Sequence, residues 1–517
     1  MATSRLPARQ STNVGMTAHV ANALVRACVL RGAPRGRVPA VSESKQSPSP
    51  ATYTEKSPYT METTSEFGEL GLSIIGVASQ YPPYALEPDQ VQHLAERFYP
   101  ESQAMKKVLS INRFTGIDTR ASIGTSDHPL VNAKEAPSIS ELHRTFMSDG
   151  VPLAVEAARK SIAEAGIALS DITHIVSTTC TDSANPGFDH FVLKGLGITH
   201  QVERVLLHGV GCSGGLAALR TAANLALGHA ARRKPAIILC VALEVSTTMV
   251  RSELNSINDT QETRIGVCLF SDCGSAVVLS NGIGEKTSEP VYELLGWEHK
   301  VIPDTEDDLG FDVDPLGWKV VLSPRVPSLT AKVLNPTFAE LMRDVPDMGP
   351  KYRNAADFDW AMHPGGATIL TGAERAMSIS PEHMRASYTT YINHGNSSSA
   401  TIFSVMDTLR SKEMDELAPG GHVKDFVVGC AFGPGITVEM CMLKRNLGAR
   451  GVDGLQTPPE TDSEGSRSDV DDGPDWASED PKESAPDTPE PEMNEISRDT
   501  GRDEAFISEA LDRVELD

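Results

Sequence analysis

The feature that most constrains the fold is an alternation of short apolar runs with segments of helical periodicity, which extends from about residue 66 to residue 445. ITHIVSTTC (172–180) and PAIILCVALEV are typical of buried strands. Residues 150–167, in contrast, carry apolar side chains at helical spacing and stop at a glycine. Strands that alternate with helices in this way predict an α/β layered fold.

The alternation is absent from both ends of the chain. Residues 1–65 are rich in serine, proline, alanine and arginine, and their first acidic residue is Glu43. This composition is typical of an organelle transit peptide, so residues 1–40 are candidates for mitochondrial targeting of an otherwise cytoplasmic protein. The simpler explanation is a disordered extension. Residues 446–517 are acidic, proline-rich and poor in apolar residues, which predicts a disordered tail.

Charge and cysteine content narrow the classes of function. About 17 of the 24 net negative charges lie in residues 451–517, and no lysine/arginine cluster interleaves with aromatic residues, which argues against a nucleic-acid partner. No window approaches the roughly 18 apolar residues of a membrane helix. Neither CxxC pairs nor Cys/His metal spacing occurs, so we expect reduced intracellular thiols and no metal site. The cysteines are Cys28, Cys180, Cys212, Cys240, Cys268, Cys273, Cys430 and Cys441.

Cys212 lies where an apolar run meets a helical pattern, in VLLHGVGCSGGLAALR (205–220). A cysteine at a helix N-terminus is close to the positive end of the helix dipole, which favours the thiolate. The flanking glycines would let a substrate carbonyl and the backbone approach closely. Cysteine is also among the most buried residue types, so this motif alone leaves a core cysteine and a nucleophile both open.

His363 and Asn396 are the candidate partners of such a thiol. His363 ends the predicted strand ADFDWAMH and precedes Pro-Gly-Gly, a turn that would point the imidazole out of the sheet end. Asn396 lies in HGNSSSA, directly before a predicted helix. It could be a plain helix cap, or an amide donor that completes an oxyanion hole with the histidine.

Four segments in this order, GCSGGLAALR, HPGGATIL, GNSSSA and AFGPGITVE, resemble the type III polyketide synthases, the enzymes similar to chalcone synthase. The segment STTCTDSANPGFDHFVLKGLG resembles the fungal branch of that family. The resemblance covers about residues 66–445. It implies a thiolase-like αβαβα fold of two similar halves, in which residues 66–285 carry the nucleophilic cysteine and residues 286–445 carry the histidine and asparagine.

The resemblance also implies roles for individual residues. Cys212, His363 and Asn396 would be catalytic, and Phe270 would be the gatekeeper between a CoA tunnel and the cavity, although core packing would explain Phe270 equally well. Val320 falls near a second cavity phenylalanine of the plant enzymes, which suggests a differently shaped pocket. The other implied lining residues are Thr179, Cys180, Ser398, Gly433 and Pro434. Basic residues of 102–120 would meet CoA phosphates at the tunnel mouth, or form a solvated basic face; they are Lys106, Lys107, Arg113 and Arg120.

The chemistry implied by the resemblance is an iterative condensation. A Cys212 thiolate paired with a His363 imidazolium would attack an acyl-CoA starter, which we expect to carry a fatty acyl group. Malonyl-CoA would then lose CO2 to give an enolate held by His363 and Asn396. The implied products are pyrones, resorcinols or resorcylic acids. CoA thioesters are the implied substrates, no cofactor is expected, and a homodimer is implied.

Four alternative functions are weighed at this point. An initiating ketoacyl-ACP synthase uses the same three residue types on the same fold, and a chalcone-like enzyme would accept an aromatic starter. A hydroxymethylglutaryl-CoA synthase would need a catalytic glutamate, for which the sequence offers no clear candidate. A non-catalytic protein that binds a partner through its acidic tail is the alternative from a different class.

Overall fold

The computed structural model describes residues 69–284, 289–314 and 317–447, which all belong to one compact unit. The targeting and disorder predicted for the two ends fall outside these residues and stay predictions. None of the helices in the described part combines the length and the hydropathy that crossing a membrane requires.

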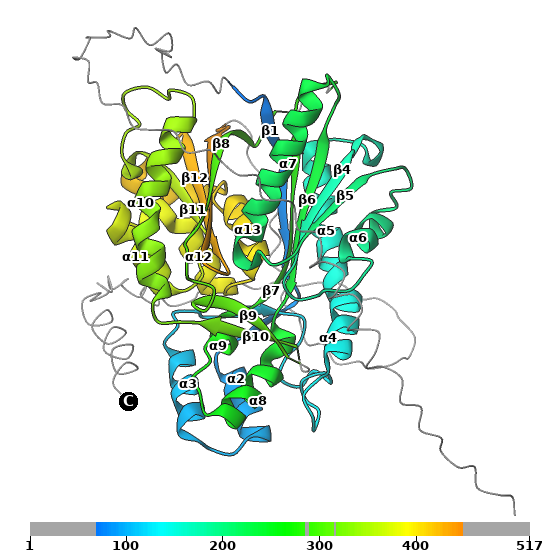
Figure 1. Ribbon diagram of the computed structural model, residues 1–517, viewed down its shortest axis with the longest axis vertical. Coiled ribbons are helices and arrows are strands. Elements are labelled where there is room, and N and C mark those ends of the chain that lie inside the picture. Colours follow the sequence, from blue (N-terminus) through cyan, green and yellow to red (C-terminus); the bar gives the residue numbers. More distant parts are fainter. Residues whose placement is uncertain (1–68, 285–288, 315–316, 448–517) are drawn as a thin grey trace, which may run out of the picture. The chain divides into compact units, whose positions relative to one another are not determined.

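The centre of the fold is a nine-stranded mixed sheet (Figure 1) with the order β11-β12-β13-β8-β1-β7-β6-β4-β5. The two halves of the chain join where β1 pairs antiparallel with β8, through Leu72 with Leu294 and Ile74 with Tyr292. The strands of the first half are β1 (Leu72–Gln80), β4 (His174–Thr178), β5 (Glu203–Leu207), β6 (Ile237–Val245) and β7 (Asp272–Ser280). Those of the second half are β8 (Tyr292–Val301), β11 (Asp359–Met362), β12 (Phe426–Gly433) and β13 (Thr437–Arg445).

Strand β6 shows how the sheet separates two helical layers. Its side chains alternate, so that Ile238 and Cys240 pack toward α7 (Gly214–Ala231) and α13 (Thr401–Thr408). Their neighbours Leu239 and Val241 pack toward α5 (Val151–Ala165) and α6 (Phe188–Leu196) on the opposite face. Burial on both faces explains why this strand is a continuous apolar run in the sequence.

The second half repeats the arrangement. Val427 of β12 packs in the same cluster as α7 and α13, whereas Val428 faces α10 (Val326–Asp344) and α11 (Ala367–Met377). The layers therefore run helix, sheet, helix, sheet, helix, with α7 and α13 in the middle. This confirms the αβαβα fold of two similar halves.

Backbone geometry ends two helices of the first half at glycines, and it confirms the stop predicted for residues 150–167. Gly166 follows α5 with φ of 65°, and Gly197 follows α6 with φ of 79°. Both are left-handed conformations that terminate a helix and that glycine adopts at least cost. The chain can therefore leave each helix and enter the next strand over a short loop.

Several elements that the sequence analysis did not identify gather at one end of the sheet (Figure 1). There the hairpin of β9 (Leu309–Asp314) and β10 (Gly317–Leu322) contacts α8 and α9, and α3 contacts the same two helices. The helices are α2 (Asp89–Phe98), α3 (Gln103–Arg113), α8 (Val250–Thr260) and α9 (Gly266–Leu269). The remaining elements are β2 (Tyr84–Leu86), β3 (Arg120–Ser122), α4 (Ile139–Thr145), α12 (Arg385–His394) and α14 (Lys412–Glu416).

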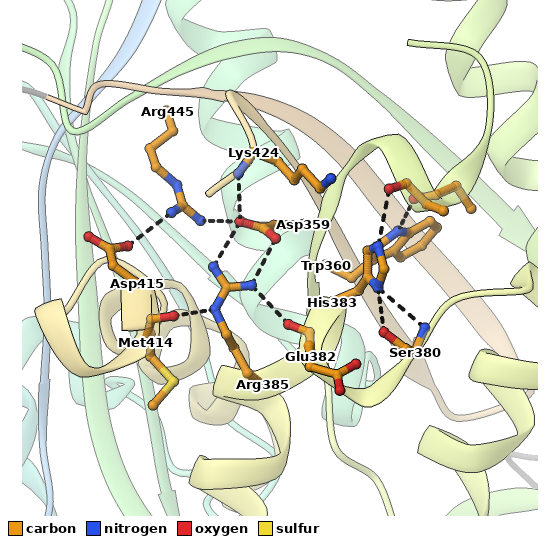
Figure 2. Close-up of polar contacts among 12 residues, drawn as sticks. Asp359, Trp360, Ser380, Glu382, His383, Arg385, Met414, Asp415, Lys424 and Arg445 are labelled. Atoms are coloured by element: carbon orange, nitrogen blue, oxygen red, sulfur yellow. Dashed lines mark hydrogen bonds and ion pairs between the residues drawn. The ribbon is translucent and has the colours of Figure 1, made fainter. Parts of the chain in front are cut away.

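A buried ionic network fixes the start of β11, the strand that leads to His363 (Figure 2). Asp359 is fully buried and accepts two hydrogen bonds from the Arg385 guanidinium, at 2.8 and 2.9 Å. The Arg445 guanidinium donates to the same carboxylate at 2.9 Å, and the backbone N–H of Lys424 adds a fourth contact at 3.3 Å. One carboxylate thereby ties β11 to α12 and to the last residue of β13.

Candidate active site

Cys212 lies in a 3₁₀ turn, Gly211–Ser213, between β5 and α7. Gly211 has φ of 47°, and a Cβ there would come within 2.5 Å of Pro434. A Cβ on Gly214 would come within 2.4 Å of the Thr178 hydroxyl. The glycines around Cys212 therefore allow its turn to pack directly against β4 and the loop after β12.

The Cys212 side chain is 7% exposed and belongs to a small apolar cluster with Phe270 and Val320. Phe311, on β9, packs against this cluster, with its ring centroid 5.9 Å from that of Phe270. Phe270 and Val320 thus lie beside the thiol, as the resemblance implies. Phe311 was missed because the sequence offered no motif for the β9–β10 hairpin that carries it.

His363 directly follows β11, and its backbone N–H donates to the carbonyl of Cys430 in the neighbouring strand at 2.8 Å. Its ring is 1% exposed, and neither ring nitrogen has a hydrogen-bond partner among the described residues. Burial lowers the pKa of His363 to about 3, because the imidazolium would lose its hydration. The resting ring is therefore neutral, with one N–H to donate and one lone pair to accept a proton.

Asn396 links the motifs through both ends of its side-chain amide. Its Nδ2 donates to the carbonyl of Gly365 at 3.3 Å, in the turn that begins at His363. Its Oδ1 accepts the backbone N–H of Ser398 at 2.8 Å, and its own N–H donates to the Leu269 carbonyl. These bonds fix which end of the amide presents a donor and hold Asn396 beside the Phe270 backbone, with which it forms an isolated β-bridge.

Ser398 joins Asn396 to the thiol, because its backbone N–H donates to Asn396 and its Oγ lies 3.4 Å from Cys212 Sγ. Burial raises the pKa of the Cys212 thiol to about 12; the hydrogen bond with Ser398 lowers the pKa, and the carboxylate of Glu244 raises it. The isolated thiol is therefore neutral. A thiolate forms only if its proton has a nearby acceptor and the α7 dipole stabilises the charge.

Thr179 and Cys180 follow β4 and surround Glu244, a buried acid on β6 that the sequence analysis missed. The Cys180 backbone N–H and the Thr181 hydroxyl donate to the Glu244 carboxylate at 3.1 and 2.9 Å, and Cys180 Sγ lies 3.3 Å from both Glu244 and Ser398 Oγ. Desolvation raises the pKa of Glu244. An acidic residue near the end of an otherwise apolar strand, VALEV, was the signal that could have identified it.

The loop residues Gly433 and Pro434 support the Cys212 turn. A Cβ on Gly433 would come within 2.3 Å of the Ser213 hydroxyl, and Pro434 packs on Gly211. The structure thus brings together Cys212, His363, Asn396, Phe270, Val320, Thr179, Cys180, Ser398, Gly433 and Pro434, through the contacts described above.

The basic residues of 102–120 do not form one group. Arg120 is buried, and its guanidinium donates to the carbonyls of Val267 and Phe270 at 2.6 and 3.2 Å, so it holds the gatekeeper backbone rather than facing solvent as a tunnel-mouth cation would. Lys106 and Arg113 line a separate surface pocket of about 290 Å³. Lys106 there pairs with Glu101 at 2.7 Å. A role of these two residues in CoA binding stays a prediction.

The fold and the gathered cysteine, histidine and asparagine define a thiolase-like condensing enzyme. Within that class the chain belongs to the chalcone and stilbene synthases: the N-terminal domain of that family matches residues 100–283 and the C-terminal domain matches residues 293–446. It is a type III polyketide synthase, and hence an acyltransferase.

Relatives with known names and structures agree with this assignment. The chain is 69% identical to a type III pentaketide synthase from Neurospora crassa whose structure is solved, with a TM-score of 0.72 over 73% of this chain and 100% of that chain. It is 39% identical, over 74% of this chain and 96% of the relative, to the acylalkylpyrone synthase csyB of Aspergillus oryzae. The structure of CsyB complexed with CoA-SH matches with a TM-score of 0.69 over 72% of this chain and 100% of that chain.

Proposed function

We propose that this enzyme extends a fatty acyl-CoA starter by repeated decarboxylative condensation with malonyl-CoA and cyclises the product to a pyrone, resorcinol or resorcylic acid. One observation carries the assignment of the site: a continuous path of contacts runs from Cys212 Sγ through Ser398 and Asn396 to the turn that begins at His363. These contacts connect the candidate nucleophile and the amide donor to the turn that carries the histidine, and they support one shared site for the three motifs.

In the first step, Cys212 loses its proton to the free lone pair of His363 and attacks the carbonyl carbon of the starter thioester. The new carbon–sulfur bond replaces the bond to CoA, whose departing thiolate takes the proton from His363. Thiolate and imidazolium each overcome the cost of burial only in the presence of the other, because opposite charges at close range favour both charged forms.

In the second step, the malonyl carboxylate leaves as CO2 and its bonding electrons form an enolate on the thioester. Asn396 Nδ2 and the neutral His363 ring N–H donate hydrogen bonds to the enolate oxygen. The one buried carboxylate named at this site, Glu244, is held by donors from Cys180, Thr181 and Ser399. The enolate carbon then attacks the acyl carbonyl on Cys212 and releases the thiolate for another round.

The starter chain would be accommodated behind Phe270. A pocket of about 20 Å³, lined by Phe270, Val320, Arg120 and Val267 among others, lies beside the cluster that contains Cys212. It has room for about one water molecule, so side chains around it must move to admit an acyl chain. The name of the Aspergillus oryzae relative, an acylalkylpyrone synthase, supports a fatty rather than an aromatic starter.

The proposal is tested by incubating the full chain with malonyl-CoA and a series of short, medium, long and aromatic acyl-CoA starters, with products read by mass spectrometry. We expect products that contain more than one malonyl-derived unit, with higher yields from fatty starters than from the aromatic one. No turnover with any starter would refute the proposal.

We also propose that the enzyme is a homodimer, on family membership alone. A light-scattering mass equal to one 55.4 kDa chain would contradict the homodimer.

The main alternative, an initiating ketoacyl-ACP synthase, is distinguished by its donor. A strict requirement for malonyl-carrier protein together with a single condensation would favour that enzyme. Multiple condensations from free malonyl-CoA would favour the type III polyketide synthase activity that we propose.

Replacing His363 by alanine should lower the rate at which iodoacetamide alkylates Cys212 at pH 7 by at least ~10-fold, since each unit of pKa changes the thiolate fraction about tenfold. The direction of this change follows from two opposing effects on the pKa of the Cys212 thiol. Burial raises that pKa, and the opposite charge of a His363 imidazolium lowers it. The pH at which the alkylation rate is half its maximum should be higher in the variant than in the wild type.

The alkylation is read on the Cys212 peptide by mass spectrometry, which separates it from Cys180. His422→Ala, which changes an exposed histidine, is the matched control and should alkylate as the wild type does. An unchanged pH profile in His363→Ala would show that His363 does not accept the Cys212 proton.

A further inference from the structure

A group of three potential metal ligands lies outside the active site, at the opposite end of α7 from Cys212. The ring nitrogens of His174 and His229 and a carboxylate oxygen of Glu203 lie within 4.8 Å of one another. They come from the first residues of β4 and β5, which are direct partners in the parallel pairing, and from the last turn of α7. We propose that these three side chains bind a divalent transition metal ion of the Zn²⁺ type.

His174 is prepared as a ligand by its neighbours. Its Nδ1 lies 2.7 Å from the Thr173 hydroxyl, which is itself 3.0 Å from both the N–H and the carbonyl of Ile237. The hydroxyl proton goes to that carbonyl, so the hydroxyl accepts the Nδ1–H of His174. The lone pair is then on Nε2, which is buried and makes no hydrogen bond among the described residues, with Glu203 3.6 Å away. Burial also lowers the pKa of His174, which keeps the ring neutral.

His229 is oriented in the same way. Its Nδ1 lies 3.2 Å from the carbonyl of Pro235, and a carbonyl can only accept, so Nδ1 carries the proton and Nε2 the lone pair. The His229 ring stands edge-on to that of His174, with centroids 4.6 Å apart. A histidine whose second nitrogen donates to an oxygen is the common arrangement around protein-bound metals, because that bond fixes the tautomer.

Glu203 is the third ligand, and its side chain can move as the three ligand atoms close around the metal ion. Tetrahedral zinc with ligand bonds of 2.0–2.1 Å places its ligand atoms roughly 3.3 Å apart, so the group must contract by about an ångström or more. The Glu203 side chain is 73% exposed and His229 is half-buried, so both can rotate toward the buried His174. Two histidines and one carboxylate are a donor set that suits zinc and similar ions and leaves a position for water.

The test is equilibrium dialysis of Zn²⁺ into the full, untagged chain after removal of metal by a chelator. We expect one equivalent to bind and to raise the melting temperature, since a ligand that binds only the folded state stabilises it. Glu203→Gln and His229→Ala should each weaken binding at least ~10-fold and reduce the melting shift. Glu203→Gln changes an exposed side chain, so its result does not depend on refolding of the core.

His422→Ala is the control for His229→Ala and should bind zinc as the wild type does. Co²⁺ bound in place of zinc should show no sulfur-to-metal charge-transfer band, which separates this site from the cysteines. Wild-type affinity in both ligand variants, a thiolate band, or no stoichiometric zinc would overturn the proposal. None of these readouts uses polyketide formation, so the result stands apart from the test of the proposed function.

Discussion

Cys212→Ala is expected to reduce product formation by at least ~1,000-fold, because alanine cannot hold the acyl chain as a thioester while the enolate attacks. The fold should survive, since the Cys212 side chain packs in a small satellite cluster and not in the three large cores. Decarboxylation of malonyl-CoA without condensation should continue, because the donors that stabilise the enolate belong to His363 and Asn396. Product and released CO2 are measured separately, by mass spectrometry and with labelled malonyl-CoA.

Cys240→Ala is the matched control, because Cys240 is a fully buried thiol in β6 that packs against α7 and takes no part in the site. Its activity should stay near that of the wild type. Full product formation by Cys212→Ala would exclude covalent catalysis by this thiol and favour a non-catalytic role of the GCSGG motif. Loss of CO2 release in the same variant would show that the thiol also supports decarboxylation.

Asp359→Asn is expected to lower the free energy of unfolding by ~3–5 kcal/mol. The substitution leaves the buried Arg385 guanidinium without its compensating charge, and it leaves Arg445 with only Asp415, 3.5 Å away (Figure 2). It should also lower activity, since Asp359 begins the strand that positions His363. Denaturant unfolding followed by circular dichroism measures the first effect, and the starter assay measures the second.

Asp127→Asn is the control with the same chemical change at the surface. Asp127 pairs with Arg97 at 3.0 Å, but its side chain is 72% exposed, so the expected loss is below ~1 kcal/mol. A loss of that small size in Asp359→Asn would mean that the amide, a rotated arginine or entering water replaces the ion pair at little cost.

The sequence predicted those parts of the fold that depend on local pattern. β4 and β6 were recognisable because a strand buried on both faces is a continuous apolar run, and α5 because its helical pattern stops at a glycine. Cys212, His363 and Asn396 were recognisable through motifs in a fixed order. The residue that joins Cys212 to Asn396, Ser398, could be named only by resemblance.

The rest depended on contacts between distant residues. Glu244 contacts Ser399, which is 155 positions away in the sequence, and Arg120 contacts Phe270, which is 150 positions away. Contacts between residues so far apart leave no local signal in the sequence. Arg120 was grouped with Lys106 because they are near in sequence, yet Arg120 is on a buried strand and Lys106 is on the exposed face of a helix. The three residues of the proposed metal site gave no sequence signal for the same reason: they have no fixed spacing, because strand pairing and a helix end bring them together.

The division of the site between the two halves of the sheet has a consequence during protein synthesis. Cys212 and its turn leave the ribosome about 150 residues before His363, and Asn396 follows later still. Until β11 and β12 have joined the sheet, the thiol has neither its proton acceptor nor the amide donor beside it. Under the proposed mechanism, a nascent chain surrounded by acyl-CoA would therefore carry an unreactive cysteine, and acylation would begin only when the whole core is complete.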